Sequence, residues 1–294
     1  MVEKVRSTEG GGRGKRDGER LRSTGGRPGR AARSPRPAVA FVTGATSGIG
    51  EATARALSAE GYDVVITGRR AERLRQLKAQ LEAQYGNDVL PLAFDVRDRV
   101  QCETAVDTLP AKFARIAVLV NNAGLALGLD RIHEGQTSQW DQMIDTNIKG
   151  LLYITRKVAA KMVEARAGHI INIGSISGTQ PYEKGGVYCA TKSAVHALSQ
   201  GMRIDLLPFG IKVTEIRPGM VDTEFSLVRF DGDGGAADEV YEGVTPMTGE
   251  DIAGAIVWAL AQPAHVNIDE IVLTPVAQAN AYYTFRKTRK PSKK

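Results

Sequence analysis

The sequence predicts a single doubly wound α/β domain built on a seven-stranded parallel sheet. From Ala38 onward, short apolar runs alternate with longer amphipathic segments, a pattern typical of strands and helices joined by right-handed crossovers. Several short runs are apolar at consecutive positions, which is expected of strands that helices cover on both faces. The predicted strands are 39–42, 64–66, 89–94, 118–120, 170–173, 212–216 and 271–273.

The spacing of residues between these strands indicates amphipathic helices. Leu74, Leu77 and Leu81 recur three and four positions apart, so they share one face of a helix. A later segment has the same spacing and predicts a second helix that packs on the sheet. Its inward face is predicted to comprise Ile144, Ile148, Leu151, Leu152 and Thr155.

The positive charge of the chain is concentrated at its two ends. The net charge is +6, but residues 1–37 hold 11 Lys/Arg against 4 Asp/Glu, residues 286–294 add six positive charges, and the body 38–285 is acidic. Segment 1–37 is rich in Gly, Arg, Ser and Pro and almost lacks aliphatic residues, so we expect a disordered basic tail. We therefore expect no nucleic-acid site on the body. The tails remain either passive extensions or weak, nonspecific polyanion-binding arms.

The sequence also indicates a location and argues against metal chemistry. No apolar run approaches the roughly 18 to 20 residues of a membrane span, and the N-terminus lacks the hydrophobic stretch of a signal peptide. We therefore expect a cytoplasmic protein without membrane contacts. The two cysteines, Cys102 and Cys189, have no companion at metal-ligand spacing, and the four histidines are scattered. No metal site is expected.

A glycine-rich loop follows the first predicted strand and opens the first helix. Gly44 permits the tight turn, Gly48 allows close approach to a pyrophosphate, and Gly50 lets helix and strand pack together. The helix N-terminus supplies N–H donors and a positive dipole. A glycine turn without a ligand is the alternative. The loop predicts a Rossmann-type dinucleotide site that includes Gly44, Thr46, Ser47, Gly48, Ile49 and Gly50.

The end of the second strand indicates which dinucleotide binds. Enzymes that use NAD usually place an acidic residue there against the ribose 2′-hydroxyl, whereas this chain has Arg69 and Arg70. A guanidinium binds a 2′-phosphate through bidentate, charge-assisted hydrogen bonds, and Ser47 can add another. We therefore predict NADP as the cofactor. The alternative is that both arginines only cap the following helix from solvent.

Polar and small residues follow the third and fourth strands. Asp95 and Val96 come just after the third strand, where a carboxylate can accept a hydrogen bond from the adenine amine. Asn122, Ala123 and Gly124 end the fourth strand, where small residues let the backbone line a nucleotide channel. Because ligands of open α/β sheets bind at the carboxyl ends of the strands, these residues are expected to join the glycine loop in one site.

A serine, a tyrosine and a lysine form the candidate catalytic group. Tyr188 and Lys192 are four residues apart, so within a helix they lie on one face. A free phenol titrates near ~10, and a fixed neighbouring cation favours its ionised form. Tyr188 thereby becomes a candidate acid/base, and Ser175 adds a hydroxyl to the group. A tyrosine–lysine pair on a helix surface without any function is the alternative.

These motifs together resemble the short-chain dehydrogenases/reductases over residues 38–275. The resemblance implies that Tyr188 is the acid/base and that Lys192 lowers the Tyr188 pKa and binds the nicotinamide ribose. It also implies that Ser175 polarises the reacting carbonyl or hydroxyl and that Asn147 holds a water of the proton relay. It also implies a homotetramer paired through the helices that contain Asn147 and Tyr188. Further cofactor contacts implied by it are Pro218, Gly219, Val221 and Thr223.

Segments 121–128, 143–147, 169–175 and 218–225 resemble more closely the NADP-dependent 3-hydroxy acid dehydrogenases, also called serine dehydrogenases. That resemblance implies oxidation of L-serine, L-allo-threonine or 3-hydroxypropionate at C3, reversible with carbonyl reduction. A substrate carboxylate requires a cation, and Lys184 and Arg229 are the candidates beside Ser175 and Tyr188. Two alternatives remain: a broad NADPH carbonyl reductase of neutral aldehydes and ketones, and a noncatalytic NADPH-binding regulator.

Overall fold

The computed structural model describes residues 38–287, so the predicted disordered segment 1–37 and most of the predicted tail 286–294 lie outside this range. Arg286 and Lys287 are described. Arg286 donates hydrogen bonds to the carbonyls of Val240 and Glu242, and the Lys287 N–H donates to Gly243. Contacts with the body therefore continue two residues past the predicted boundary. Between residues 38 and 287, no helix has both the length and the apolar composition to cross a bilayer.

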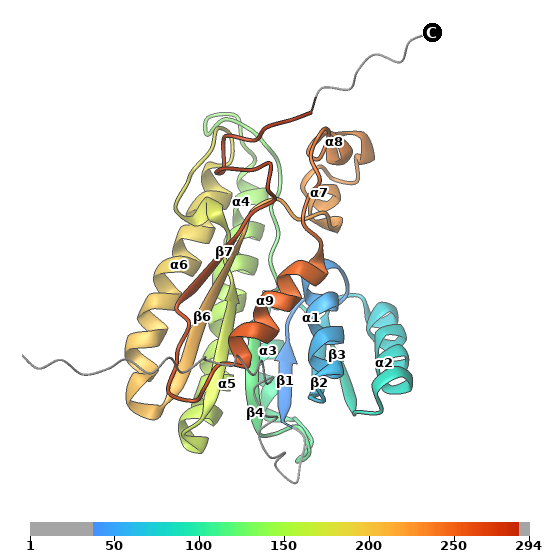
Figure 1. Ribbon diagram of the computed structural model, residues 1–294, viewed down its shortest axis with the longest axis vertical. Helices are drawn as coiled ribbons and strands as arrows, with labels where there is room; N and C mark the ends of the chain where they lie inside the picture. The colour runs from blue at the N-terminus through green and yellow to red at the C-terminus, as the bar shows by residue number, and fades with distance from the viewer. Residues whose placement is uncertain (1–37, 288–294) are drawn as a thin grey trace, which may run out of the picture. The chain divides into compact units, whose positions relative to one another are not determined.

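Seven parallel strands form one sheet in the order β3-β2-β1-β4-β5-β6-β7 (Figure 1). The prediction of a seven-stranded parallel sheet is confirmed, and the ends of the strands differ from the predicted ones by a few residues. The order reverses between β1 and β4, which opens a crevice at the carboxyl ends of these strands. The strands are β1 Val39–Val42, β2 Asp63–Gly68, β3 Val89–Ala93, β4 Ile116–Asn121, β5 Gly168–Ile173, β6 Ile211–Pro218 and β7 Glu270–Leu273.

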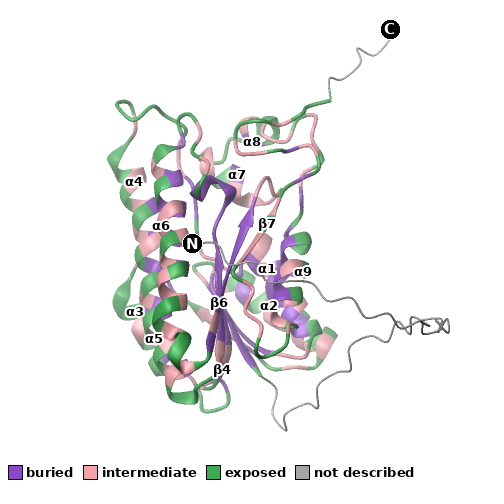
Figure 2. Ribbon diagram, turned by 60° about the vertical axis from the view of Figure 1, so that its left-hand side comes forward, coloured by how far each residue is buried: buried purple, intermediate pink, exposed green. Residues whose placement is uncertain are grey.

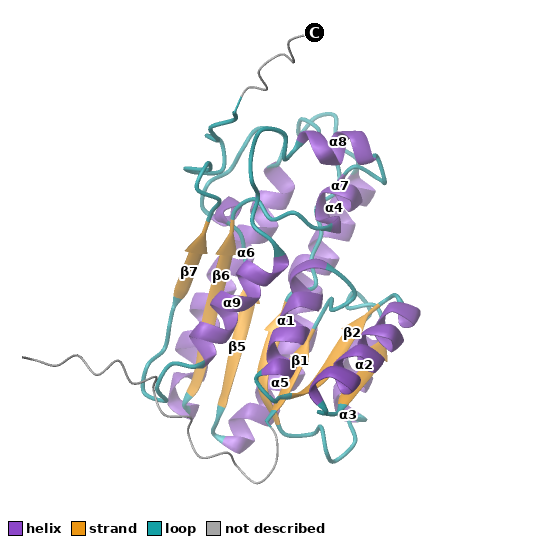
Figure 3. Cartoon of the chain, turned by 45° about the vertical axis from the view of Figure 1, so that its right-hand side comes forward, coloured by secondary structure: helices purple, strands orange, loops and turns teal. Residues whose placement is uncertain are grey.

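Helices cover both faces of the sheet, and the strands between them are largely buried (Figure 2). One face packs against α1 Gly48–Ala59, α2 Ala71–Tyr85 and α9 Gly249–Leu260. The other face packs against α3 Arg99–Asp107, α5 Leu151–Ala165 and α6 Gly186–Leu206. The remaining helices, α4 Thr137–Ile144, α7 Glu224–Arg229 and α8 Gly234–Glu239, lie toward the carboxyl end of the sheet (Figure 3).

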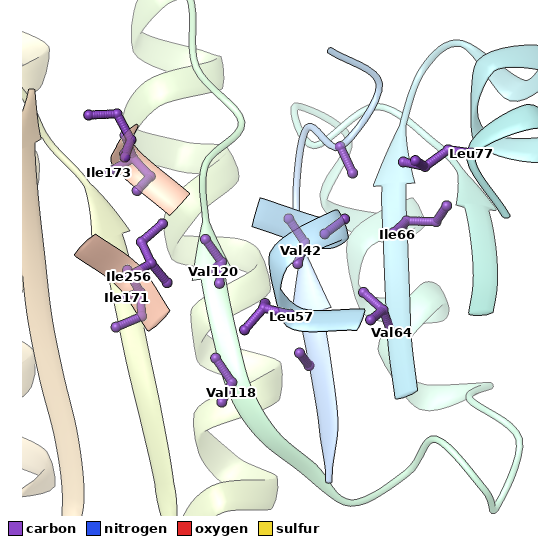
Figure 4. Close-up of a cluster of buried hydrophobic side chains, with 14 of the residues drawn as sticks. Val42, Leu57, Val64, Ile66, Leu77, Val118, Val120, Ile171, Ile173 and Ile256 are labelled. Atoms are coloured by element: carbon purple, nitrogen blue, oxygen red, sulfur yellow. The ribbon is translucent and has the colours of Figure 1, made fainter. Parts of the chain in front are cut away.

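The core on the α1 side follows the predicted periodicity. Leu74 and Leu81 are fully buried and Leu77 is 4% exposed, as the spacing predicts. In Figure 4, Leu57 of α1 and Ile256 of α9 lie among side chains of the strands. Burying large aliphatic side chains stabilises the fold by roughly 1.5 to 3 kcal/mol each, and it gives the strands a fixed frame for the residues at their ends.

The predicted inward face of the second helix is only partly correct. Leu151 and Thr155 are buried, but Ile144 and Leu152 are 37% and 38% exposed. The cause is a π-helical turn, Asp145–Gly150, between α4 and α5. Such a turn adds one residue to the helical repeat, so the buried face of α5 is rotated relative to that of α4. A regular period of 3.6 residues cannot predict this rotation, which places Asn147 in the interior.

His169 on β5 gives the fold a testable pH dependence. It is 4% exposed, its Nε2 lies 2.8 Å from the Thr214 hydroxyl, and burial lowers its pKa from 6.5 to about 3. In the unfolded chain His169 is protonated below pH 6.5, whereas in the folded chain it stays neutral down to about pH 3. The free energy of unfolding therefore falls as the pH falls from 6.5 to 3. We expect the unfolding free energy of wild type to drop about 2 kcal/mol more than that of His169→Gln between pH 7 and pH 5.

Urea unfolding of the two proteins across this pH range measures the difference. His265→Gln is the control, because His265 is exposed and should leave the pH dependence of wild type unchanged. Parallel pH profiles for wild type and His169→Gln would show that His169 is protonated in the folded protein.

Candidate active site

A cleft of about 610 Å³ opens at the carboxyl ends of the strands. The glycine loop, the ends of β2, β4 and β5, helix α6 and the segment after β6 all contribute to its wall. Every predicted cofactor residue except Gly50 lines it, and so do Ser175 and Arg229. Gly50 and Asn147 do not line the cleft. Lys184 lines a smaller adjoining cavity of about 160 Å³, which shares Tyr188 and Arg229 with the main cleft.

The glycine loop has a shape that only glycine permits. Gly44 and Gly48 have φ values of +67° and +54°, a region that side chains disfavour. A Cβ on Gly44 would lie 2.9 Å from Ala123 Cα, and one on Gly50 would lie 2.2 Å from the Gly44 oxygen. The loop thus folds tightly against the end of β4 and leads into α1, whose first N–H groups have no acceptor within the helix. This cradle fits a pyrophosphate.

The end of β4 is tied to this loop by hydrogen bonds. The Asn122 side chain donates to the carbonyls of Thr43 and Gly44 at 2.9 and 3.1 Å. The Thr43 hydroxyl oxygen accepts hydrogen bonds from the N–H groups of Asn122 and Ala123, each at 3.0 Å. Asn122 lines the cleft as predicted, and its side chain also holds the two strand ends together.

The two arginines after β2, Arg69 and Arg70, line the same cleft. The Arg70 guanidinium donates to the Thr46 hydroxyl at 2.7 Å and to the Ser47 hydroxyl at 2.8 Å. It also pairs with Glu224 at 2.6 Å, and Arg73 pairs with the other oxygen of the same carboxylate at 2.5 Å. Neither Arg73 nor Glu224 was among the residues predicted from the sequence. Arg73 follows Arg70 by one helical turn, which is a usable signal, whereas Glu224 is 154 residues away and gives none.

Asp95, the predicted acceptor for the adenine amine, is paired with Arg97. The Arg97 guanidinium donates to the carboxylate at 2.6 and 3.0 Å. Burial raises the pKa of Asp95, but the hydrogen bonds from Arg97 outweigh burial and hold it below the usual range. Asp95 is therefore a carboxylate at neutral pH and lies in the wall of the cleft, with part of its hydrogen-bonding capacity already used.

Tyr188 is 9% exposed, and its ring packs edge-on against Phe225. Burial raises the pKa of its phenol above 10, while a hydrogen bond with Ser175 and the charge of Arg229 act in the opposite direction. Lys192 Nζ lies 6.0 Å from the ring centroid and donates to the Ile173 carbonyl at 2.8 Å. The structure thus brings the predicted serine, tyrosine and lysine together. The charge of Arg229 opposes the rise of the Tyr188 pKa, an effect that the sequence predicted for Lys192.

Asn147 is held by hydrogen bonds to the protein on both sides of its amide. Nδ2 donates to the Leu125 carbonyl at 2.8 Å and to the Thr191 hydroxyl at 2.9 Å, and Oδ1 accepts from the Leu125 N–H at 2.9 Å. A Cβ on Gly124 would lie 3.3 Å from this oxygen and 3.6 Å from Lys192 Nζ. Asn147 therefore fixes the chain after β4 beside the lysine.

A group of ionisable side chains near Lys192 was not predicted from the sequence either. Glu215 is fully buried, and its Oε2 lies 2.6 Å from His196 Nδ1; burial raises its pKa, and contact with His196 opposes that rise. Arg217 pairs with Glu270 at 2.9 Å, and Glu270 approaches the same imidazole. Burial lowers the Lys192 pKa to about 8, and the Glu215 charge opposes this, so the group helps to keep the lysine protonated.

Of the two predicted carboxylate partners, Arg229 lies close to Tyr188. Its guanidinium carbon is 5.8 Å from the centroid of the Tyr188 ring and 5.4 Å from that of Tyr182. Its Nε–H donates to the Gly128 carbonyl, which holds the end of α7 over the cleft. Lys184 is exposed, with a φ of +63°, and lines the smaller cavity but not the main cleft.

Known proteins resemble this chain over most of its length. A family model described as short chain dehydrogenase matches residues 38–232. The NADP-dependent 3-hydroxy acid dehydrogenase YdfG of Salmonella typhi is 49% identical over 244 residues, which cover 83% of this chain and 97% of that protein. The serine 3-dehydrogenase of Agrobacterium fabrum is 45% identical over 242 residues, 82% of this chain and 95% of that protein.

Solved structures agree with these matches. The closed form of serine dehydrogenase complexed with NADP+ superimposes with a TM-score of 0.80 at 45% identity and covers 85% of this chain and 100% of the other. The serine dehydrogenase from Escherichia coli gives a TM-score of 0.71 at 41% identity, over 82% of this chain and 99% of the other. On this similarity, and with the glycine cradle and the Ser175, Tyr188 and Lys192 group in one cleft, the chain belongs to the short chain dehydrogenase family.

Proposed function

We propose that the protein is an NADP-dependent oxidoreductase that oxidises short 3-hydroxy acids at C3, of the L-serine, L-allo-threonine and 3-hydroxypropionate type, and that it catalyses the reverse carbonyl reduction. The position of Arg229 carries the proposal. Its guanidinium carbon lies 5.8 Å from the centroid of the Tyr188 ring, so the cation and the phenol border the same part of the cleft. A short hydroxy acid bound at Tyr188 can reach this cation with its carboxylate, which a guanidinium binds bidentately. The names of the Salmonella typhi and Agrobacterium fabrum relatives support the same substrate class.

The geometry of the site supports the following catalytic roles. NADP, when bound, supplies the hydride acceptor for oxidation, and its reduced form supplies the donor for reduction. Tyr188 takes the proton of the C3 hydroxyl in oxidation and returns it in reduction. Ser175 donates a hydrogen bond to the same oxygen. Lys192, with its pKa at about 8, is mostly protonated at neutral pH; there it favours the phenolate and binds the nicotinamide ribose.

Asn147 completes the proposed catalytic group. Its role in holding a water of the proton relay remains part of the proposal, and the bonds of its side chain to Leu125 and Thr191 support a positioning role beside it. Both roles depend on the π-helical turn that carries Asn147.

The proposed nucleotide-binding residues come from the ends of five strands and from helix α6: Gly44, Thr46, Ser47, Gly48, Ile49, Gly50, Arg69, Arg70, Asp95, Val96, Asn122, Ala123, Gly124, Tyr188, Lys192, Pro218, Gly219, Val221 and Thr223. Two observations support this assignment. The glycine cradle leaves room that a Cβ would fill, because a Cβ on Gly48 would lie 3.0 Å from the Thr223 side chain. In addition, Arg70 and Arg73 together bind one anionic group, the Glu224 carboxylate. A phosphate is a group of the same charge sign and hydrogen-bonding type.

The carboxylate contact predicts a selective effect of Arg229→Gln. Loss of a charge-assisted hydrogen bond costs about 2 kcal/mol, so kcat/KM for L-serine and 3-hydroxypropionate should fall about 30-fold. The value for a neutral alcohol such as propane-1,3-diol should change less than threefold. Initial rates with NADP for both substrate classes measure the effect.

Lys184→Gln is the matched comparison, because Lys184 is the other candidate cation. A larger loss in Lys184→Gln than in Arg229→Gln would transfer the carboxylate contact to Lys184. Equal kcat/KM of the wild type for acids and neutral alcohols would favour a broad carbonyl reductase instead.

The proposed assembly is a homotetramer paired through the long helices that carry Asn147 and Tyr188. Apolar side chains on the outer faces of these helices support it: Leu152 on α5 is 38% exposed and Ile204 on α6 is 73% exposed. A second copy of the chain would cover such positions.

A further inference from the structure

We propose that the Glu224 carboxylate occupies the binding site of the 2′-phosphate of NADP(H) while no cofactor is bound. The phosphate then displaces this carboxylate from Arg70 and Arg73 when the cofactor binds. The inference rests on the cofactor site proposed above. It adds a residue that this site does not itself require: an acid that competes with the cofactor for its arginines.

The contacts of Glu224 are those expected of a bound phosphate. Oε2 accepts from Arg70 at 2.6 Å, and Oε1 accepts from Arg73 at 2.5 Å, so one anionic group bridges two guanidinium groups. The remaining donors of Arg70 bind the hydroxyls of Thr46 and Ser47. The geometry is already that of an anion site, with an acceptor from the protein in place.

Glu224 carries its charge at every relevant pH. Partial burial raises its pKa, but the hydrogen bonds from Arg70 and Arg73 outweigh burial and lower it to about 2. The side chains of the three residues are 35 to 46% exposed, so a ligand can reach them from the cleft and solvent. A carboxylate and a 2′-phosphate cannot share these donors without strong repulsion between like charges. One anion must therefore leave when the other binds.

The position of Glu224 connects this exchange to the reacting end of the site. Glu224 is the first residue of α7 and Arg229 is the last. Ion pairs thus hold the first residue of α7 to Arg70 and Arg73, and its last residue lies over Tyr188. Binding of NADP(H) breaks these ion pairs. NAD, which has a 2′-hydroxyl, leaves them in place, so Glu224 weakens the binding of NADP(H) alone and lowers the preference for NADP(H) over NAD.

Binding of nucleotide fragments tests the exchange without any turnover. The probe is adenosine 2′,5′-bisphosphate, and adenosine 5′-monophosphate, which lacks the 2′-phosphate, is the reference ligand. Titration calorimetry should show that Glu224→Gln binds the bisphosphate about fivefold more tightly than wild type, because no carboxylate has to be displaced. Binding of the monophosphate should be unchanged. The affinity of Glu224→Gln for the bisphosphate should also fall more steeply with salt, because the phosphate then pairs with free arginines.

Asp222→Asn is the matched control. It removes one negative charge two residues earlier in the chain, and within residues 38–287 the Asp222 carboxylate forms no ion pair. Its affinity for the bisphosphate should change less than twofold. An equal gain in Asp222→Asn would mean that general charge is responsible and would overturn the proposal. Unchanged or weaker binding in Glu224→Gln would also overturn it, because Glu224 would then only orient the arginines.

The double variant Arg70→Ala/Arg73→Ala separates this inference from the proposed function. If it still prefers the bisphosphate as wild type does, the 2′-phosphate binds elsewhere and the exchange is wrong. The substrate panel with L-serine and neutral alcohols is independent of that result. Circular dichroism and thermal unfolding of each variant verify that it is folded before binding is measured.

Discussion

Tyr188→Phe should lower kcat about a thousandfold while NADPH still binds. The phenol is the only proposed group that exchanges a proton with the substrate oxygen, and such general acid–base catalysis typically contributes 10²- to 10⁴-fold. The ring itself is retained, so its packing against Phe225 and beneath Arg229 should persist. Single-turnover kinetics measure the chemical step, and quenching of protein fluorescence measures NADPH affinity.

Tyr182→Phe is the control for this variant. Tyr182 lines the same cleft and also contacts Arg229, but the mechanism gives its hydroxyl no proton to transfer. We expect its kcat to fall less than tenfold. A Tyr188→Phe enzyme that retains a tenth or more of wild-type turnover would refute the assigned acid/base.

Arg70→Ala should lower kcat/KM for NADP about 100-fold and change the value for NAD less than threefold. Arg70 lies beside Thr46 and Ser47 at the mouth of the cleft, where a 2′-phosphate would receive its charge-assisted hydrogen bonds. Each such bond contributes roughly 1.5 to 3 kcal/mol, and a guanidinium supplies two at once. Initial rates with both cofactors at saturating substrate give the ratio directly.

Arg75→Ala provides the comparison for Arg70→Ala. Arg75 lies in α2, five residues after Arg70, and carries the same charge, but it pairs with Glu72 and does not line the cleft. Its preference for NADP over NAD should equal that of wild type. If Arg70→Ala keeps that preference as well, Arg69 or Arg73 must bind the phosphate.

Most of the fold could be predicted because its signals are local. The buried strands appear as apolar runs, and Leu74, Leu77 and Leu81 repeat with the period of a helix. The π-helical turn at Asp145–Gly150 is the exception. It depends on how the helix packs near the site, so the regular period wrongly placed Ile144 and Leu152 inside.

The candidate site was predictable to the same extent. The glycine loop requires positive φ values, and this requirement is visible in its residues. The spacing of Tyr188 and Lys192 places them on one helix face. By contrast, the pairing of Asp95 with Arg97 and the burial of Glu215 against His196 depend on side-chain directions and neighbouring strands. Neither follows from spacing.

The amino-acid sequence alone predicted the apolar strands, the glycine loop, the two arginines after β2 and the tyrosine–lysine pair. Each depends on the conformation of a few consecutive residues, which local sequence controls. The contacts of Glu224 with Arg70 and Arg73, and the position of Arg229 over Tyr188, could not be predicted in this way and depend on the packing of the whole domain. These contacts join residues far apart in the chain, and their strength depends on burial and charge, which arise only when the elements pack together.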